Sequence, residues 1–190
     1  MFKKIFTTAV GLIVLVLCGL IVLRCCMSAD RSIMTDIIPS EALRNAYTAG
    51  ALTAVTTEEP AADIADDGYY SVYGLVYFPE LHQVQITVRY NRSLFSYVGK
   101  PEGTEFSYTL GEKDGSERIS PTVVETYEKG IYIYRRLVFD GVDVEEETAL
   151  YCFMRLSDTY ESENPVHHAM QPLVNRKFTK AELQMLGSAE

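Results

Sequence analysis

A run of nineteen uncharged residues, Ile5–Leu23, constrains this chain more than any other feature. The run lies between Lys4 and Arg24, and at the rise of an α-helix it covers roughly 28 Å. That length matches the hydrocarbon core of a bilayer, which is about 30 Å thick. The run therefore predicts a transmembrane helix, and the remaining chain is expected to be tethered to a membrane or delivered through one.

The run is interpreted as an uncleaved signal-anchor, because two other export signals fit it less well. A cleaved signal peptide usually has a core of about 7–15 apolar residues, which this run exceeds. Cleavage after Ser28 would place Cys26 at the third position before the cut, which is a poor match. A lipoprotein signal needs a small residue directly before the modified cysteine, whereas leucine, arginine and cysteine precede the three N-terminal cysteines. We therefore expect residues 1–4 to form a cytoplasmic tail and residues 5–24 a retained transmembrane helix.

The orientation of the span is inferred from the form of the N-terminus. Lysine and arginine residues near a span tend to stay in the cytoplasm, but here Lys3 and Lys4 balance Arg24 and Arg31. A very short basic head directly before an apolar core is typical of an export signal. We therefore predict a single-pass protein in the cell membrane, with its N-terminus in the cytoplasm and its C-terminal domain outside. Residues 5–24 would contact the lipid bilayer.

The charge of the remaining chain limits the partners of its soluble part. The chain has 17 basic and 26 acidic residues, and two of the basic residues precede the run. Beyond the run, 15 basic residues face 26 acidic ones, which gives a net charge of −11. This charge disfavours nucleic acid and anionic headgroups as partners. It suits an exported domain and selects no particular ligand.

Cysteine usage bears on the compartment and on the source of the chain. Cys18 lies within the run, Cys25 and Cys26 lie at its end, and Cys152 is the only cysteine beyond them. A disulfide framework is therefore excluded for the distal domain. A disulfide-free exported β domain is more typical of bacteria, particularly Gram-positive ones, than of animals.

Residues 25–67 are interpreted as a partly helical stalk that ends in an acidic linker. Ser40 is placed to cap a helix that would continue to Val55, although Gly50 weakens its middle. The sequence that follows, TTEEPAADIADDG, is small and acidic, as flexible spacers are. A single loose helix followed by a mobile linker is therefore expected.

From Gly68 the hydrophobic pattern changes to the period of two that β-strands show. Gln83–Asn91 is the clearest strand, and further strands are predicted at Tyr69–Phe78, Glu105–Leu110, Thr122–Tyr127, Ile131–Phe139 and Thr148–Leu156. Glycine-containing turns separate them, with no helical pattern between. This mainly β pattern predicts an antiparallel sandwich over residues 68–158. An immunoglobulin-like sandwich of about seven strands fits best, although the chain has no tryptophan and so lacks the signature of true immunoglobulin domains.

Residues 159–190 are expected to form a C-terminal extension with a short helix. Thr179 and Glu182 have the spacing of a capping box at the start of that helix. The helix is expected to pack on the rim of the sandwich through Leu183 and Leu186.

Tyrosines are the first candidates for a binding surface, since twelve of the thirteen fall between Tyr69 and Tyr160. Two groups are each expected to share one face of a strand: Tyr69, Tyr73 and Tyr77 in one strand, and Tyr132 and Tyr134 in another. Aromatic ladders can stack on sugars or hold extended peptides. The alternative is a framework role, because aromatic residues favour strands and cross-strand pairs. The absence of tryptophan argues against a sugar ligand.

Metal and cofactor sites have weaker support. The acidic turn that contains Asp140, Asp143 and Glu145 offers the oxygen ligands that calcium prefers, but its spacing does not follow the EF-hand. A solvated acidic turn is the favoured interpretation. His167 and His168 are adjacent, so in an extended segment their side chains would point in opposite directions. No metal or cofactor is therefore expected.

A resemblance adds to this interpretation without supplying an activity. The segments GYYSVYGLVYFPELHQVQITVRYNRS and IYIYRRLVFDGV, together with the anchor and stalk, resemble uncharacterised single-pass proteins of Gram-positive bacteria. The resemblance covers roughly residues 66–156. It implies a membrane-anchored β domain, and it assigns no site residue.

The leading hypothesis is therefore a non-catalytic binding or interaction module at the cell envelope. Its partner would be another envelope protein or a cell-wall component. The alternatives are a membrane-tethered hydrolase, using His167 or His168 with Asp158 or Glu161, and a structural subunit whose span pairs with other membrane helices. No serine lies in a nucleophile elbow, and Cys152 lies within a predicted strand.

Overall fold

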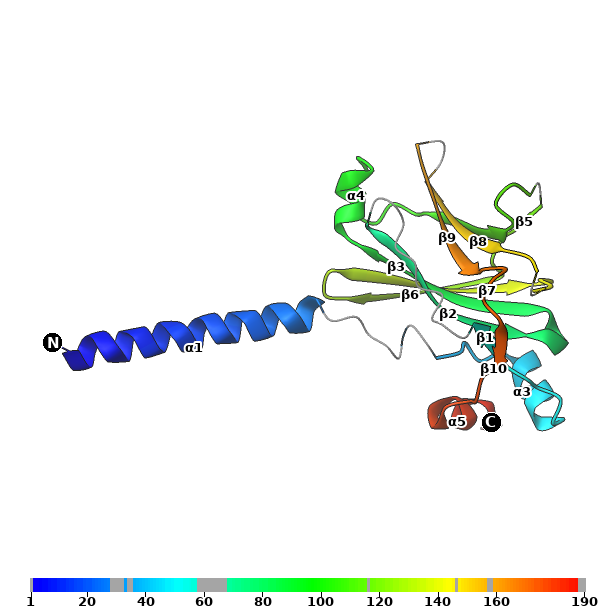
Figure 1. Ribbon diagram of the computed structural model, residues 1–190, viewed down its shortest axis with the longest axis horizontal. Coiled ribbons are helices and arrows are strands. Elements are labelled where there is room, and N and C mark those ends of the chain that lie inside the picture. Colours follow the sequence, from blue (N-terminus) through cyan, green and yellow to red (C-terminus); the bar gives the residue numbers. More distant parts are fainter. Residues whose placement is uncertain are drawn as a thin grey trace.

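Figure 1 shows one long helix, α1 (Phe2–Met27), followed by a β-rich domain. The computed structural model describes residues 2–27, 33, 36–57, 68–115, 117–145, 147–156 and 159–187. Within α1, the window Thr8–Cys25 has a mean hydropathy of 2.5, and none of it is buried against the rest of the chain. The helix is long and apolar enough to cross a membrane, which fits an anchor or a signal sequence.

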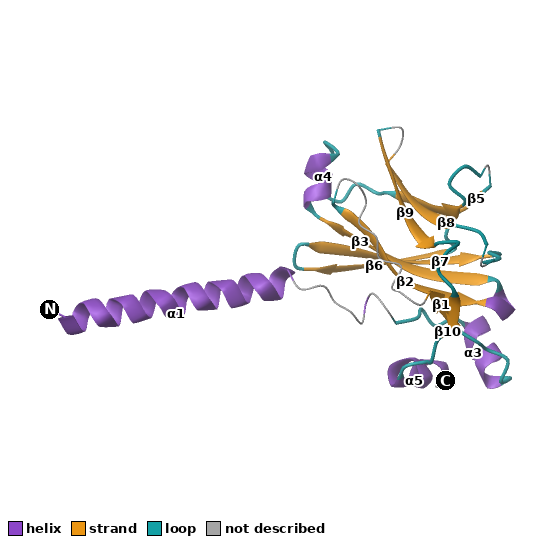
Figure 2. Ribbon diagram, in the orientation of Figure 1, coloured by secondary structure: helices purple, strands orange, loops and turns teal. Residues whose placement is uncertain are grey.

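Two antiparallel sheets make up the domain (Figure 2). The larger sheet has the strand order β10-β1-β2-β3-β7-β6, and the smaller has the order β5-β4-β8-β9. The larger sheet contains β1 (Val55–Thr57), β2 (Tyr70–Phe78), β3 (Gln83–Asn91), β6 (Val123–Lys129), β7 (Tyr132–Asp140) and β10 (Leu173–Asn175). The smaller contains β4 (Ser107–Gly111), β5 (Arg118–Ile119), β8 (Leu150–Leu156) and β9 (Tyr160–His167). The mainly β, antiparallel architecture predicted from the sequence is confirmed.

The main core lies between the two sheets. Every second side chain of β3 points into it, and these residues are at most 2% exposed: Val84, Ile86, Val88 and Tyr90. The smaller sheet contributes Tyr108, Leu110, Cys152 and Met154. The polar face of β3 is buried as well, at Gln83, Gln85 and Thr87. Other parts of the chain therefore cover this part of the outer face of the larger sheet.

A β-bulge in β2 decides which tyrosines share a face. The register between β2 and β3 shifts between Tyr73 and Val76, where β2 has an extra residue. Gly74 adopts a φ of +64° there, a conformation that glycine reaches without steric cost. Beyond the bulge Tyr77 points into the main core. The expectation that Tyr77 shares a face with Tyr69 and Tyr73 is therefore wrong, because one extra residue reverses the alternation.

Two helices cover part of the outer face of the larger sheet. These are α3 (Glu41–Thr48) and α5 (Lys180–Gly187), which contact each other below β1 and β10 in Figure 1. They enclose a second apolar cluster that contains Ile37, Leu43, Ala54, Val76, Phe78 and Leu186. The cluster makes this region a third layer of the domain.

Residues 36–57 therefore pack on the domain and differ from the predicted stalk. The hydroxyl of Ser40 caps α3, as predicted, by accepting a backbone N–H at 3.2 Å. The helix ends before Gly50, which has a φ of +69°, so Val55 lies in β1 and not in the helix. The predicted helix was too long because propensity alone does not show that the short strand β1 follows. The predicted acidic linker at residues 58–67 lies outside the described residues.

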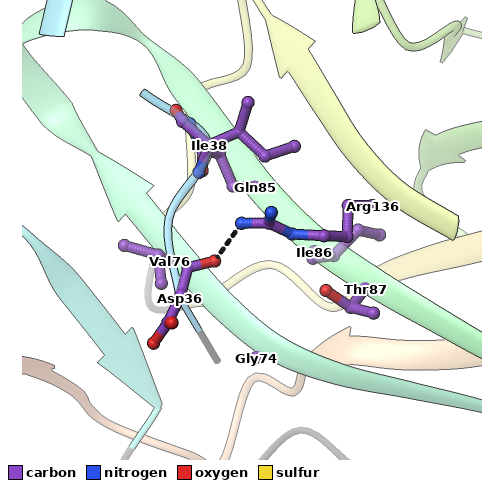
Figure 3. Close-up of a pocket in the computed structure, with 8 residues that line it drawn as sticks. All are labelled: Asp36, Ile38, Gly74, Val76, Gln85, Ile86, Thr87 and Arg136. Carbon is purple, nitrogen blue, oxygen red and sulfur yellow. Dashed lines mark hydrogen bonds between the residues drawn. The ribbon is translucent and has the colours of Figure 1, made fainter. Parts of the chain in front are cut away.

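A short segment outside any helix or strand, residues 36–38, lies on the outer face of the larger sheet and is called the strap below. The backbone N–H of Ile38 donates to Oε1 of Gln85 at 2.7 Å, and Nε2 of Gln85 donates to the Ile38 carbonyl at 3.0 Å. Arg136 donates to the carbonyl of Asp36 at 2.5 Å (Figure 3). Both side chains therefore bind backbone atoms of the strap, and these bonds satisfy polar groups that burial would otherwise leave unpaired.

Glu182 of α5 also holds the strap. Its carboxylate accepts the backbone N–H of Ile37 at 3.0 Å and the backbone N–H of Thr179 at 2.7 Å, and it pairs with Arg176 at 2.7 Å. The Glu182 N–H in turn donates to the Thr179 hydroxyl at 3.2 Å, so the predicted capping box is confirmed. The N-terminal segment of the domain and its last helix are therefore joined at one buried carboxylate.

The C-terminal residues form more of the domain than the predicted extension. Residues 159–190 supply β9 to the smaller sheet and β10 to the larger one, so the domain continues beyond the predicted boundary at 158. Leu186 of α5 is buried in the second apolar cluster, as predicted, whereas Leu183 is 39% exposed. The helix packs on the outer face beside α3, where a single leucine of this pair reaches the apolar cluster.

We expect Glu182→Ala to lower the free energy of unfolding by about 3 kcal/mol, because it leaves Arg176 and two backbone N–H groups without their buried partner. Burial raises the pKa of Glu182, but the hydrogen bonds from Arg176, Thr179 and Ile37 outweigh it and hold the pKa below its usual value. A depressed pKa stabilises the fold above the unfolded value of about 4.3, and this contribution is lost as the pH falls through the lower, folded pKa. Urea unfolding at pH 7 and at acidic pH measures both effects.

The exposed Glu147→Ala serves as the matched control and should change stability by less than about 0.5 kcal/mol. Equal stability of the Glu182 variant and this control at pH 7 would contradict the role of the buried carboxylate.

Candidate functional site

The outer face of the larger sheet carries the strongest binding candidate, a stack of Tyr73, Arg89 and Tyr132. The guanidinium of Arg89 lies 4.8 Å from the ring centroid of Tyr73 and 4.6 Å from that of Tyr132. Arg89 belongs to the central strand β3, and the two tyrosines lie diagonally across it on β2 and β7, where Thr87 and Asn91 are their direct partners. The antiparallel register of three strands therefore builds the stack.

The positive charge of Arg89 distinguishes this stack from aromatic pairs that only stabilise a sheet. Each cation–π contact contributes roughly 0.5–1 kcal/mol at a partly exposed site. Among the described residues, no carboxylate lies within ion-pair distance of the Arg89 guanidinium, although the chain is acidic overall. A half-exposed cation held between two aromatic faces is suited to a carboxylate or an aromatic ring of a partner.

The other predicted tyrosines lie elsewhere. Tyr69 stacks on Tyr97 of α4 (Ser93–Tyr97), with 4.8 Å between ring centroids. Tyr134 is fully buried on the outer face, although its ring lies 6.4 Å from that of Tyr132. Tyr77 faces the main core. The structure therefore brings Tyr73 and Tyr132 together around Arg89, and the five predicted residues do not form one ladder.

The open edge of the larger sheet lies on the other side of β7. In the part of the chain that the structure describes, β6 is the last strand of this sheet and pairs only with β7. Val123 and Tyr127 are exposed on its outer face, and Val124 is 46% exposed on its inner face. Arg136 of β7 pairs with Glu125 of β6 at 3.2 Å, which fixes the charged side chains of the edge. An exposed edge strand with apolar side chains can accept a further strand.

Figure 3 shows a small cavity beside the strap. Its volume is about 10 Å³, which is room for about one water molecule. Its lining residues are Asp36, Ile38, Gly74, Val76, Gln85, Ile86, Thr87 and Arg136. The cavity is therefore too small for any ligand larger than a water molecule.

A larger pocket of about 350 Å³ lies beside the acidic turn. Leu110, Ile119, Val142 and Leu150 line it with Glu112, Glu117 and Asp143. The pocket is open to solvent and combines apolar side chains with carboxylates. It has the size of a small-molecule site, but its lining presents negative charge without a basic group to orient a ligand.

The predicted acidic turn is occupied by interactions within the protein. The carboxylate of Asp140 accepts hydrogen bonds from Gln83 at 2.7 Å and Thr122 at 2.6 Å. Asp143 pairs with Nδ1 of His82. Across the described residues, no group of three or more histidine, cysteine or acidic side chains is arranged to hold a metal ion. Neither Asp140 nor Asp143 joins Glu145 in such a group.

Among the described residues, the structure does not bring the candidate pair His167 and Glu161 of the hydrolase alternative together. His167 is 1% exposed, and its Nε2 lies 2.9 Å from the Glu145 carbonyl. Glu161 pairs with Arg118 and Arg155 near the other end of β9, about 20 Å along the strand at 3.3 Å per residue. Asp158 lies outside the described residues.

Comparisons with known proteins assign no role to these sites. No family model, curated protein or solved structure matches the chain. The function is therefore inferred from the geometry and chemistry of the sites themselves.

We expect Cys152 to be inert toward maleimides at neutral pH. It is fully buried between the sheets, and desolvation raises the pKa of its thiol to about 12, against a smaller lowering by the Tyr70 hydroxyl. Because the thiolate is the reactive form, almost none is present at pH 7. In a variant with Cys18, Cys25 and Cys26 replaced by serine, mass spectrometry should detect labelling only after denaturation. Rapid labelling of the folded protein would contradict this burial.

Proposed function

We propose that this protein is a membrane-anchored, extracytoplasmic binding module that performs no catalysis. In this proposal α1 is retained as a signal-anchor, the N-terminus lies in the cytoplasm and the β domain lies outside. The length and exposure of α1 support the anchor. The basic head before the span supports the orientation.

The observation that carries the binding role is the Arg89 cation between Tyr73 and Tyr132. Arginine and tyrosine are the residue types that dominate binding energy in protein interfaces. Here they form a rigid group on three neighbouring strands, and the guanidinium has no acidic partner among the described residues. A partner that presents a carboxylate or an aromatic ring would complete these contacts.

The open edge at β6 supports a protein as the partner. The strand is seven residues long and exposes Val123, Val124 and Tyr127, which an added strand would cover. Strand addition supplies backbone hydrogen bonds, and contacts with Tyr127 and the neighbouring Arg89 stack would supply specificity. We therefore propose an envelope protein as the partner, bound at the outer face and edge of the larger sheet.

We also propose that the two sheets form an immunoglobulin-like sandwich. Two packed antiparallel sheets support it. The sheets of six and four strands exceed the seven strands expected from the sequence.

The orientation is tested by a Met170→Cys variant in which Cys18, Cys25 and Cys26 are serines. Met170 is 88% exposed in the turn after β9, whereas Cys152 is buried and adds no background. A membrane-impermeant maleimide should label intact cells that carry Cys at position 170 and should not label the parent without it. Labelling only after lysis would place the domain in the cytoplasm and contradict the proposal.

The binding face is tested by crosslinking in intact cells with a photoreactive residue at position 127. We expect crosslinks to one discrete envelope protein, and we expect Arg89→Ala to reduce the yield by about tenfold, as the loss of a central arginine contact does.

Arg118→Ala is the matched control, because Arg118 stacks on Phe153 at 3.6 Å on the outer face of the other sheet. It should leave the yield unchanged. Equal yields from both variants, or no crosslinked protein, would overturn the binding role of the Arg89 stack.

A further inference from the structure

One end of the sandwich carries a group of tyrosines that the binding proposal does not use. This end, called the α4 end below, comprises α4, the turn between β6 and β7, and the start of β2. Tyr97 of α4 is 56% exposed, and its ring lies 4.8 Å from that of Tyr69 and 6.5 Å from that of Tyr160. The hydroxyl and the apolar ring of tyrosine suit a boundary between water and an apolar phase.

The path of the chain shows which end of the domain faces α1. The Thr87 hydroxyl donates to the Ile33 carbonyl at 3.4 Å, and Gln85 binds Ile38 further along the chain. From Ile33 to Ile38 the chain therefore advances along β3 from Thr87 toward Gln85, so that Ile33 lies nearer to Asn91, where β3 ends and α4 follows. Figure 1 shows α4 and the turn between β6 and β7 on the side of the domain that faces α1.

The reach of the connecting chain limits the gap between this end and α1. Ile33 follows Met27 by six positions, so the chain between their Cα atoms spans at most about 20–22 Å. Thr87 lies four residues before the end of β3 at Asn91, which is about 13 Å along the strand. The α4 end therefore lies within about 7–9 Å of the level of Met27, and the headgroup region beyond each side of the hydrocarbon core is itself about 5–7 Å thick.

We propose that the α4 end rests on the headgroup layer of the bilayer that holds α1, with Tyr97 inserted among the headgroups. This inference rests on the proposed retention of α1 as an anchor. Tyrosine is enriched at membrane interfaces, which fits the exposed ring of Tyr97 and its contacts with Tyr69 and Tyr160.

Local charge permits this contact although the domain is acidic as a whole. Arg92 pairs with both Glu102 and Glu128 at the α4 end, so two carboxylates there share a basic partner. Lys100, which follows α4 in the chain, is exposed. The charges of Arg92 and Lys100 therefore balance those of Glu102 and Glu128 at this surface. A surface without net charge suits a layer of zwitterionic lipid headgroups.

The absence of tryptophan from the chain permits a direct test. Tyr97→Trp and Met170→Trp each introduce a single fluorophore at an exposed position, and Met170 lies after the far end of β9. Each full-length variant is reconstituted at low protein density into phosphatidylcholine vesicles in which some lipids carry bromine near the top of the acyl chain. Brominated lipid should quench the fluorophore at position 97 several times more strongly than the one at position 170, and emission at 97 should lie further to the blue.

Equal, weak quenching at both positions would overturn the inference. Blue-shifted emission at position 97 without quenching by brominated lipid would also overturn it, because a second copy of the protein would then shield the fluorophore in place of lipid. Co-sedimentation of the protein with the vesicles is measured in the same samples. Loss of co-sedimentation would refute the anchor itself, and with it this inference. Because the vesicles contain no envelope partner, the result is independent of the crosslinking test of the Arg89 stack.

Discussion

The arrangement of the domain depends on how polar side chains bind the backbone of the strap. Gln85 binds Ile38, Arg136 binds the Asp36 carbonyl and Glu182 binds the Ile37 N–H. These bonds allow a polar strand face to be buried, since each buried amide and carboxylate has a partner. They also attach the chain that follows α1 to the middle of the larger sheet. The length of chain between α1 and the first contact with the sheet is therefore shorter than the stalk of residues 25–67 predicted from the sequence.

This attachment places two surfaces with different chemistry close together. The Arg89 stack faces outward on β2, β3 and β7, and the α4 end continues from the same strands. If α1 is retained as the proposed anchor, a partner that reaches Arg89 would therefore approach the domain next to the membrane. The open β6 edge runs along the same sheet, which leaves one side available for strand addition while α3 and α5 cover part of the outer face near β1 and β10. The covered part of this face, near β1 and β10, belongs to the framework of the domain, and the open part, from the Arg89 stack to β6, is the proposed binding surface.

The sequence predicts the parts of this fold that rest on side-chain periodicity. The predicted bounds of β3 agree with the structure because its alternation is complete. β9 was missed because its sequence is polar and contains Pro165, and β1 is only three residues long. Gly74 was the available signal for the bulge that turns Tyr77 inward. The strap and the Arg89 stack escape prediction for another reason: backbone-directed bonds leave no pattern in sequence, and the stack depends on the register of three strands.

The contact between Ile37 and Glu182 has a consequence for the order of folding, because the two residues are 145 positions apart. A contact that closes so long a loop forms late, since its entropy cost is met only after intervening structure has formed. The strap is therefore expected to be fixed to the sheet only after the sheets have assembled and α5 has docked. If α1 is retained as the proposed anchor, a chain without α5 would leave the domain on a longer tether, and docking of α5 would bring the domain closer to the bilayer.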